Sequence, residues 1–302
     1  MSDTLPIRLV YRSRGIQLTL VSALAASGAW EKVGLDPGGD IPFIAKAADA
    51  DPKLIGGEID FIFGSHVTPY LRYDEGVPFV YLGQTVNCSD DVVVSSKPIS
   101  DVADLRGMRI GDHLGTGHPH GNRTLFLDRA GLRDGDVTWV ERGTAKPVDL
   151  VADGAADAVF LSPIDAHGAT DRGLFVHVPP PLPMVLGTTV TTLWPTVARS
   201  PELCRRLLRA LRLGIDFVKN DPEGMRAVMR DRVGPTLGIS DPDVLDRLYR
   251  RNAGLLEGDL YPRADAVDNA YRLAVRQRPD IVERVKPWSL WDLHFLRELD
   301  AE

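Results

Sequence analysis

Apolar residues follow two different spacings along the chain, and the two alternate. Short runs rich in β-branched and aromatic residues predict buried strands at residues 7–11, 41–47, 60–65 and 77–86. Between these runs, apolar residues recur at helical spacing and predict helices at residues 18–34, 51–59 and 67–76. Strand and helix therefore alternate, which favours an α/β fold with a largely parallel sheet.

A second set of such units follows about residue 95. It predicts strands at residues 108–112, 137–143 and 157–163, with helices at 101–107, 123–132 and 146–156. The chain after residue 200 is mostly helical in pattern, with amphipathic segments at 201–233, 240–252 and 263–278. We therefore expect two lobes, one made of residues 1–95 and 191–302 with the helical C-terminal part, the other of residues 96–190. A ligand cleft is expected between them, at the carboxyl ends of the sheets.

Composition narrows the function classes. The 302 residues are 44% hydrophobic and 25% charged, as in ordinary soluble proteins that bury a core. The net charge of −7 argues against a nucleic-acid partner, and no apolar run is long enough to cross a membrane. The first residues lack the pattern of a secretion signal, so we expect a cytoplasmic protein. Cys88 and Cys204 are expected to be free thiols.

Several segments resemble a known family. They are DLRGMRIGDHLGT with NRTLFLDRAGL at 104–132, ASGAWEKVGLD at 26–36, GGEIDFIFGS at 56–65 and DGAADAVFL at 153–161. Together they resemble type II periplasmic-binding-protein-like domains, which include SsuA-type and thiamine-pyrimidine-synthase-like solute receptors. The resemblance runs from about Ile7 to Leu299 and implies a two-lobed fold.

The same superfamily also contains intracellular enzymes, and the resemblance implies one of two functions. The stretch from DLRGMRIG to DVTWVERG looks most like the dihydroxyphthalate decarboxylase group. The cysteine-rich motif of yeast-type thiamine-pyrimidine synthases is absent, and YRSRG lacks the cysteine expected of an aryl sulfinate desulfinase. Because fold does not fix function, the site residues must decide.

Residues 111–123, GDHLGTGHPHGNR, hold three histidines in one loop. The glycines do not match a dinucleotide fingerprint or a P-loop. Pro119 predicts that the following helix begins no earlier than Gly121, which leaves the histidines on an irregular loop. A histidine can move protons at neutral pH, and a divalent metal site is the less favoured alternative because Asp112 is the only carboxylate here. The candidates are His113, His118 and His120 as proton carriers, with Thr116, Gly117 and Arg123 as ligand contacts.

Loops after the predicted strands supply further candidates. An arginine in YRSRG can clamp an anion with paired hydrogen bonds, whereas a solvated pair of arginines is the alternative. GSHVT places hydroxyls and a histidine where they can bind an anion or merely cap a helix. In SPIDAH, an aspartate and a histidine form an acid–base pair or belong to a surface turn. The candidate ligand contacts are Arg12, Ser13, Arg14, Ser65, Thr68, Gln84, Asn87, Ser162, Asp165 and His167, with His66 as a further proton carrier.

Two hypotheses follow. The favoured one is an intracellular, decarboxylase-like lyase acting on a small, aromatic carboxylate, with arginine binding the anion, histidine moving protons and no cofactor. The alternative is the binding protein of a transporter or a sensor for a small anionic or aromatic solute. Trp288 and Trp291, near the C-terminus, are expected to pack a last helix on the body, or to lie at an oligomer interface or the cleft rim.

Overall fold

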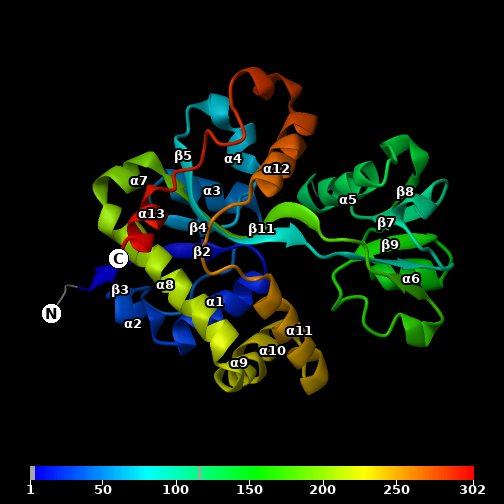
Figure 1. The fold of residues 1–302 in the computed structure, drawn as a ribbon, viewed down its shortest axis with the longest axis horizontal. Coiled ribbons are helices and arrows are strands. Elements are labelled where there is room, and N and C mark those ends of the chain that lie inside the picture. The colour runs from blue at the N-terminus through cyan, green and yellow to red at the C-terminus, as the bar shows by residue number, and fades with distance from the viewer. Residues whose placement is uncertain (1–3, 115–116) are drawn as a thin grey trace. The chain divides into compact units, whose positions relative to one another are not determined.

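A computed structural model describes residues 4–114 and 117–302 of the chain, with the backbone alone described for 117–119. The chain divides into two compact units (Figure 1). The first unit consists of Met1–Asn87 and Val185–Glu302, and the second of Cys88–Met184. Each unit is built around a sheet of its own.

The sheet of the first unit has the strand order β2, β4, β11, β5. These strands are β2 (Leu9–Tyr11), β4 (Phe61–Phe63), β5 (Phe79–Ser89) and β11 (Leu182–Leu193). β2 and β4 are parallel, whereas β11 is antiparallel to β4. The sheet is therefore mixed, and the parallel sheet expected from the sequence covers only part of it. A small sheet pairs β1 (Leu5–Pro6) with β3 (Leu35–Asp36).

The strand predicted at residues 41–47 does not form. Phe43 makes only an isolated bridge with Tyr11, and the helix α3 (Ala47–Ile55) follows at once. The helix predicted at residues 18–34 is also divided, into α1 (Ile16–Ala26) and α2 (Ala29–Val33). Gly28 lies between them with a φ of 66°, a left-handed conformation that ends one helix and suits glycine.

Helices cover this sheet. α8 (Pro201–Asn220) packs along α1 and α2 through a buried stripe of leucines, as the amphipathic pattern predicts. Its neighbours at residues 222–237 are α9 (Pro222–Val228), η5 (Met229–Val233) and α10 (Gly234–Leu237). The remaining helices are α4 (Thr68–Leu71), η1 (Tyr73–Glu75), α7 (Trp194–Arg199), α11 (Pro242–Leu255), α12 (Ala264–Gln277), η6 (Pro279–Glu283) and α13 (His294–Asp300).

The sheet of the second unit has the order β10, β6, β9, β7, β8. Its strands are β6 (Val92–Ser95), β7 (Arg109–Asp112), β8 (Thr138–Glu141), β9 (Ala158–Leu161) and β10 (Phe175–His177). β7 is parallel to β8 and β9, while β6 is antiparallel to β9 and β10. Among the described strands, β6 pairs with β9 and β10, and it lies in the second unit, Cys88–Met184, which begins and ends several residues earlier than the expected lobe 96–190.

The helices of the second unit are η2 (Val102–Leu105), α5 (Gly117–Arg129), η3 (Asp134–Asp136), α6 (Pro147–Ala152) and η4 (Thr170–Arg172). The expectation that no helix begins before Gly121 is wrong, because α5 begins at Gly117. Pro119 lies in its first turn, where the missing N–H of proline has no helical acceptor to lose. His118 and His120 are thus helical residues.

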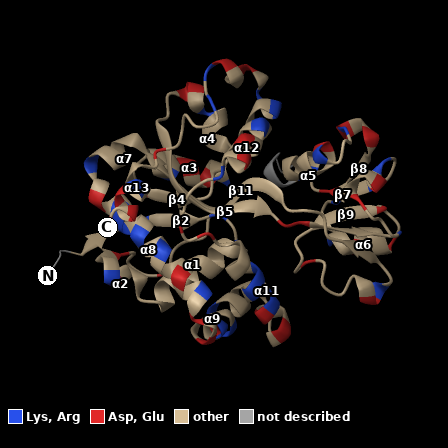
Figure 2. Cartoon of the chain, in the orientation of Figure 1, with Lys and Arg blue, Asp and Glu red and all other residues tan. Residues whose placement is uncertain are grey.

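Charged side chains are distributed without a strong bias in sign. Figure 2 shows basic and acidic residues interspersed along α8, α9, α11 and α12. This distribution differs from the concentrated basic surface of nucleic-acid-binding proteins. Of the helices in the described part of the chain, none has the length and apolar character of a bilayer-spanning segment.

Candidate functional site

The first candidate site lies where β4 ends. Gly64 and Ser65 both have a positive φ, 132° and 63°, and the latter is unusual for a residue with a side chain. Side chains of β5 and β11 hydrogen-bond to the carbonyl oxygens of this turn. The Tyr81 hydroxyl donates to those of Ser65 and His66 at 3.1 Å each, and Thr191 Oγ1 donates to that of Gly64 at 2.6 Å. The surroundings therefore impose the backbone of this turn.

Arg12, just after β2, reaches this turn. Its Nη1 donates to Ser65 Oγ at 2.8 Å and its Nη2 to the carbonyl of Ala45 at 3.2 Å. Its Nε is buried and has no hydrogen-bond partner among the described residues. Burial lowers the pKa of Arg12, against the opposing charge of Asp51. The partly buried guanidinium thus has at least one unused donor, its Nε.

Asp51 of α3 is the carboxylate of this cluster, and only 1% of the residue is exposed. It accepts from Arg72 Nη1 at 3.3 Å and from Ser65 Oγ at 3.4 Å. Burial raises the pKa of Asp51, while the charges of Arg12 and Arg72 act in the opposite direction. The sequence analysis did not select Asp51, because DPKL reads as the start of an ordinary surface helix.

A hydrogen-bonded chain runs from this turn into the sheet. Thr189 Oγ1 lies 2.6 Å from His66 Nδ1 and 2.5 Å from Gln84 Oε1. The Gln84 oxygen can only accept, so the threonine proton points to it, and His66 must donate from Nδ1. His66 is therefore protonated on Nδ1. Thr189 was not a candidate, although a run of threonines in an otherwise apolar strand was a visible signal.

Other candidates of the first unit have structural partners. Gln84 is fully buried, and its amide donates to the carbonyls of Val86 and Leu186. Asn87 donates to Glu257 and to the Tyr261 carbonyl, both at 2.9 Å, and accepts from the Arg263 amide. The Gln84 amide thus links β5 and β11, and the Asn87 amide holds the segment between α11 and α12 on β5.

The remaining candidates here lie at the surface or in turns. The exposed Ser13 donates its backbone N–H to Gln17 Oε1 at 2.8 Å, and Arg14 is exposed with its guanidinium 4.6 Å from the centre of the Phe43 ring. Thr68 is the first residue of α4, a helix with no side-chain cap. Neither the exposed Arg14 nor Thr68 shares in the Arg12 cluster.

The second candidate site lies at the end of β7. The Asp112 side chain is fully buried and pairs with both His120 and Arg123. His120 Nδ1 lies 2.7 Å from one carboxylate oxygen, and the backbone N–H of His113 donates to the other at 2.6 Å. Burial lowers the pKa of His120, with smaller opposing effects from Asp134 and Glu141. The Nδ1–H group of the ring donates to Asp112.

A second histidine pair extends this site. His113 Nδ1 lies 2.9 Å from Glu141 Oε1, and the Leu114 amide donates to Glu141 Oε2 at 2.8 Å. The bond from His113, together with the backbone bonds from Gly143 and Leu114, lowers the pKa of Glu141 to about 2. Of the other loop candidates, Thr116 lies outside the described residues, and Gly117 and His118 are placed by backbone alone.

The loop after β9 holds Ser162, Asp165 and His167. Ser162 Oγ donates to Asp165 Oδ2 at 2.7 Å, and the Asp165 amide donates back to Ser162 Oγ at 3.3 Å. Asp165 and His167 are exposed. Asp165 thus closes a serine turn, which is the alternative that the sequence left open. Among the described residues, no three His, Cys, Asp or Glu side chains lie where they could hold a metal ion.

The chain was compared with known families and structures. The family model described as NMT1/THI5 like matches residues 27–225. The chain belongs to this family. The resemblance to type II periplasmic-binding-protein-like domains and the α/β fold class expected from the sequence are confirmed.

Relatives of this NMT1/THI5-like chain include receptors and an enzyme. A candidate binding protein of Brucella abortus is 24% identical over 234 residues, which are 74% of this chain and 70% of that protein. The periplasmic aliphatic sulphonate binding protein SsuA of Escherichia coli has a TM-score of 0.71 at 18% identity, covering 95% of this chain and 92% of its own. The desulfurization enzyme DSZB has a TM-score of 0.60 at 16% identity, covering 97% and 99%. At these identities the structural matches show the fold alone.

Proposed function

We propose that this protein is a solute-binding protein for a small anion, a sulfonate or a carboxylate, and that Arg12 is its main anion contact. The observation that carries the proposal is the state of Arg12. Its partly buried guanidinium has no carboxylate partner within ion-pair distance among the described residues, and its buried Nε donor is unused. Removing a charge from water without pairing it is costly, and an anionic ligand would reduce that cost.

The surroundings support an anion at this place. The turn at Ser65 is held in a left-handed conformation by Tyr81 and Thr191, and such strain concentrates at ligand-binding positions. A relative by fold, SsuA of Escherichia coli, is named for binding aliphatic sulphonates. Binding by Arg12 and neighbouring hydroxyls needs no cofactor.

The decarboxylase-like lyase that the sequence analysis favoured is the second candidate. One observation favours it: His120 is held by the buried Asp112, and burial lowers the pKa of the ring, an arrangement suited to proton transfer. The family and its neighbours give better support to the binding protein, and the Brucella relative is named for binding. Under the lyase hypothesis, replacing His118 and His120 with alanine would abolish turnover and leave the fold intact.

The test compares two neighbouring arginines. Isothermal titration with methanesulfonate and benzoate is carried out on the wild-type protein, Arg12→Ala, Arg12→Lys and Arg14→Ala. A hydrogen bond to a charged group contributes roughly 1.5–3 kcal/mol, so Arg12→Ala should weaken binding by about 10- to 100-fold. Arg14→Ala is the control and should change affinity by less than about threefold, since a solvent-exposed charge contributes little.

Two outcomes would count against the binding protein. Equal loss of affinity in the two alanine variants would show that general charge, and not the buried guanidinium, attracts the anion. Mass spectrometry of the recovered ligand decides the other point. A ligand converted to product in the wild type but not in the His118→Ala, His120→Ala variant would establish the lyase.

A further inference from the structure

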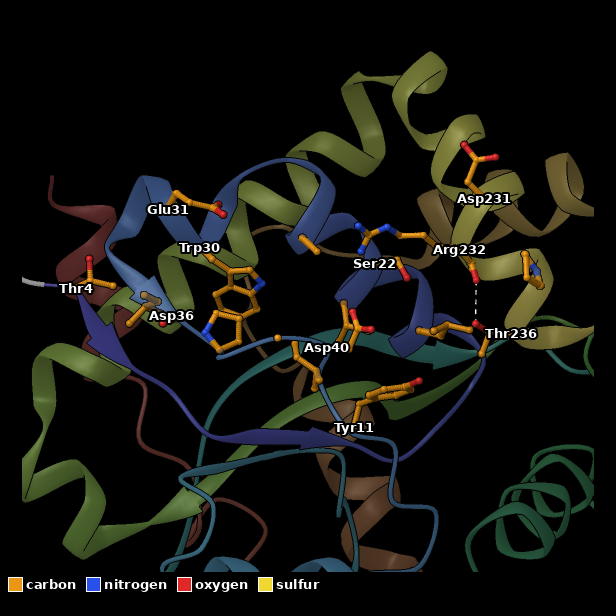
Figure 3. Close-up of a pocket in the computed structure, with 18 residues that line it drawn as sticks. Thr4, Tyr11, Ser22, Trp30, Glu31, Asp36, Asp40, Asp231, Arg232 and Thr236 are labelled. Atoms are coloured by element: carbon orange, nitrogen blue, oxygen red, sulfur yellow. Dashed lines mark hydrogen bonds between the residues drawn. The ribbon is translucent and has the colours of Figure 1, made fainter.

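The first unit contains a large cavity that the anion site does not use. Its volume is about 1100 Å³, at the upper end of the range for small-molecule sites. Its walls come from the end of β2, from α1 and α2, from the loop at 36–41 and from the helical segment at 231–236 (Figure 3). Arg12, Ser65 and Asp51 are not among the lining residues, so this is a separate place in the fold.

Two hydroxyl groups of largely buried residues face this cavity. Tyr11 and Ser22 are 5% and 7% exposed, and both line the cavity. No hydrogen bond joins either side-chain oxygen to another described residue, and neither oxygen is among the fully buried atoms that lack a partner, so both are reached from the cavity. Tyr11 Oη and Ser22 Oγ are thus free to bond a ligand, and Trp30, 4% exposed, adds an aromatic wall (Figure 3).

The charge around the cavity is mainly negative. Glu31, Asp36, Asp40 and Asp231 line it, against Arg232 as the basic lining residue. Asp231 is paired with Arg230, whereas Glu31 and Asp40 make no ion pair within the described residues. Burial raises the pKa of the Tyr11 hydroxyl, the charge of Arg14 lowers it, and the charge of Asp40, a smaller effect, raises it. Tyr11 and Asp40 both line the cavity.

The chemistry of this lining selects one class of ligand. No three of its carboxylates lie close enough to hold a metal ion, as far as the described residues go. Apolar side chains of Leu18 and Val21 form part of the wall beside the carboxylates. An organic cation with an apolar body fits both the carboxylates and the apolar wall. Its charge would lie near carboxylates, hydroxyl oxygens and an aromatic ring, and its body would cover the apolar wall.

We propose that this cavity is a second binding site, for a small organic ammonium ion with an apolar body, bound by Asp40, Glu31 and the Tyr11 hydroxyl. The proposal does not depend on the function of the Arg12 site. The two sites differ in the sign of the charge they take, although Tyr11 and Arg12 are consecutive residues at the end of β2.

The experiment uses the full chain and 2-phenylethylamine as the probe, with 2-phenylethanol as the neutral analogue of the same size. Titration calorimetry measures both on the wild type, Asp40→Asn, Tyr11→Phe and Arg12→Ala. We expect saturable binding of the amine, with the alcohol at least about tenfold weaker. Asp40→Asn should weaken the amine about tenfold and Tyr11→Phe about three- to fivefold, the scale of one charged and one neutral hydrogen bond. Arg12→Ala should leave amine binding unchanged.

Four results would overturn the proposal. One is the absence of saturable amine binding, and another is equal affinity for the amine and the alcohol. The third is an amine affinity that falls in Arg12→Ala and not in Asp40→Asn, which would place the amine elsewhere. Phenylacetate is measured as well, because binding of this anion that disappears in Arg232→Ala would show that the cavity takes the opposite charge. Asp40 is exposed, so its variant should fold normally.

Discussion

Arg12 in the first unit and Arg123 in the second are two partly buried arginines with different partners. Burial lowers the pKa of each guanidinium, and each has an Nε with no partner among the described residues. Arg123 forms a direct ion pair with the buried Asp112. Arg12 has only a serine hydroxyl and a backbone carbonyl, and the nearby Asp51 pairs with Arg72 instead.

This difference distinguishes a charge that is paired within the fold from a charge that is left available to a ligand. In the second unit the positive charge of Arg123 is neutralised within the fold, so it stabilises the end of β7 and the first turns of α5. In the first unit the nearby carboxylate, Asp51, pairs with Arg72 and not with Arg12. A guanidinium left in this state favours any anion that reaches it, which is why we assign binding to Arg12 rather than to Arg123.

The largest expected effect comes from removing each buried carboxylate. Asp112→Asn removes the carboxylate that pairs with the partly buried Arg123 and should lower the local free energy of unfolding by about 3–5 kcal/mol. Asp51→Asn should cost only about 1–2 kcal/mol, because the Arg72 side chain is 25% exposed and keeps Glu75 as a partner. Hydrogen exchange followed by mass spectrometry measures the two units separately. An equal loss in free energy of unfolding in the two variants would show that Asp112 and Asp51 do not differ in this way.

The next effect concerns two adjacent threonines of β11. Thr189→Val removes the hydrogen bonds that Thr189 makes to His66 and to the buried Gln84, and should destabilise the first unit by about 1–3 kcal/mol. Thr188→Val is the matched control, because Thr188 Oγ1 is buried without a partner and the change should be neutral or slightly stabilising. Urea unfolding monitored by circular dichroism gives both values. A Thr188 variant as unstable as the Thr189 variant would show that packing, not the hydrogen-bonded chain, supports the turn.

A smaller effect tests the strain at Ser65. Both Ser65→Ala and Ser65→Gly lose the bond to Arg12, but only glycine adopts a φ of 63° without steric cost. The glycine variant should therefore be more stable than the alanine variant by about 1 kcal/mol, measured by urea unfolding. Both should bind the anion more weakly than wild type. An alanine variant at least as stable as the glycine variant would mean that the turn carries no strain.

The smallest effect lies in the second unit, where charges are satisfied internally. The pKa of Glu141 is lowered to about 2, first by the bond from His113. Its contribution to stability is therefore present above the ordinary carboxylate range and is lost as the pH falls from about 4.5 towards 2. His113→Ala should move the Glu141 titration upward, as followed by carboxyl carbon NMR. An unchanged titration would show that the backbone amides alone hold this carboxylate.

The fold was predictable where local pattern and tertiary packing agree. The apolar runs that form β4, β7, β8 and β9 are short, with loop residues between them and the neighbouring helices. The leucines of α8 lie along one face of that helix. The predicted strand at 41–47 failed because Phe43 contacts β2 at one point before α3 begins. The mixed character of the sheets was not visible, since the direction of β6 and β11 depends on pairing between segments far apart in sequence.

The site was predictable in part. Arg12, Ser65, His120 and Arg123 stand out because charged or hydroxyl groups follow apolar runs, where parallel strands end. Asp51 could not be found in this way, since its burial results from packing of α3 and not from its neighbours in sequence. Asn87 looked equally suited to a ligand, yet its partners are Glu257, Tyr261 and Arg263, which only the fold brings near.

The strand order of the first sheet sets the sequence of events during synthesis. β11 lies between β4 and β5 in the sheet, although it follows them by a long stretch of chain. Residues Cys88–Met184 contain all five strands of their own sheet, so this sheet can form as soon as these residues have left the ribosome. The sheet of the first unit cannot be completed until Val185–Leu193 has been synthesised, and until then β4 and β5 each have an edge without its β11 partner. The part of the chain that emerges first is therefore the last to be completed, and it is the part that exposes strand edges to aggregation in the meantime.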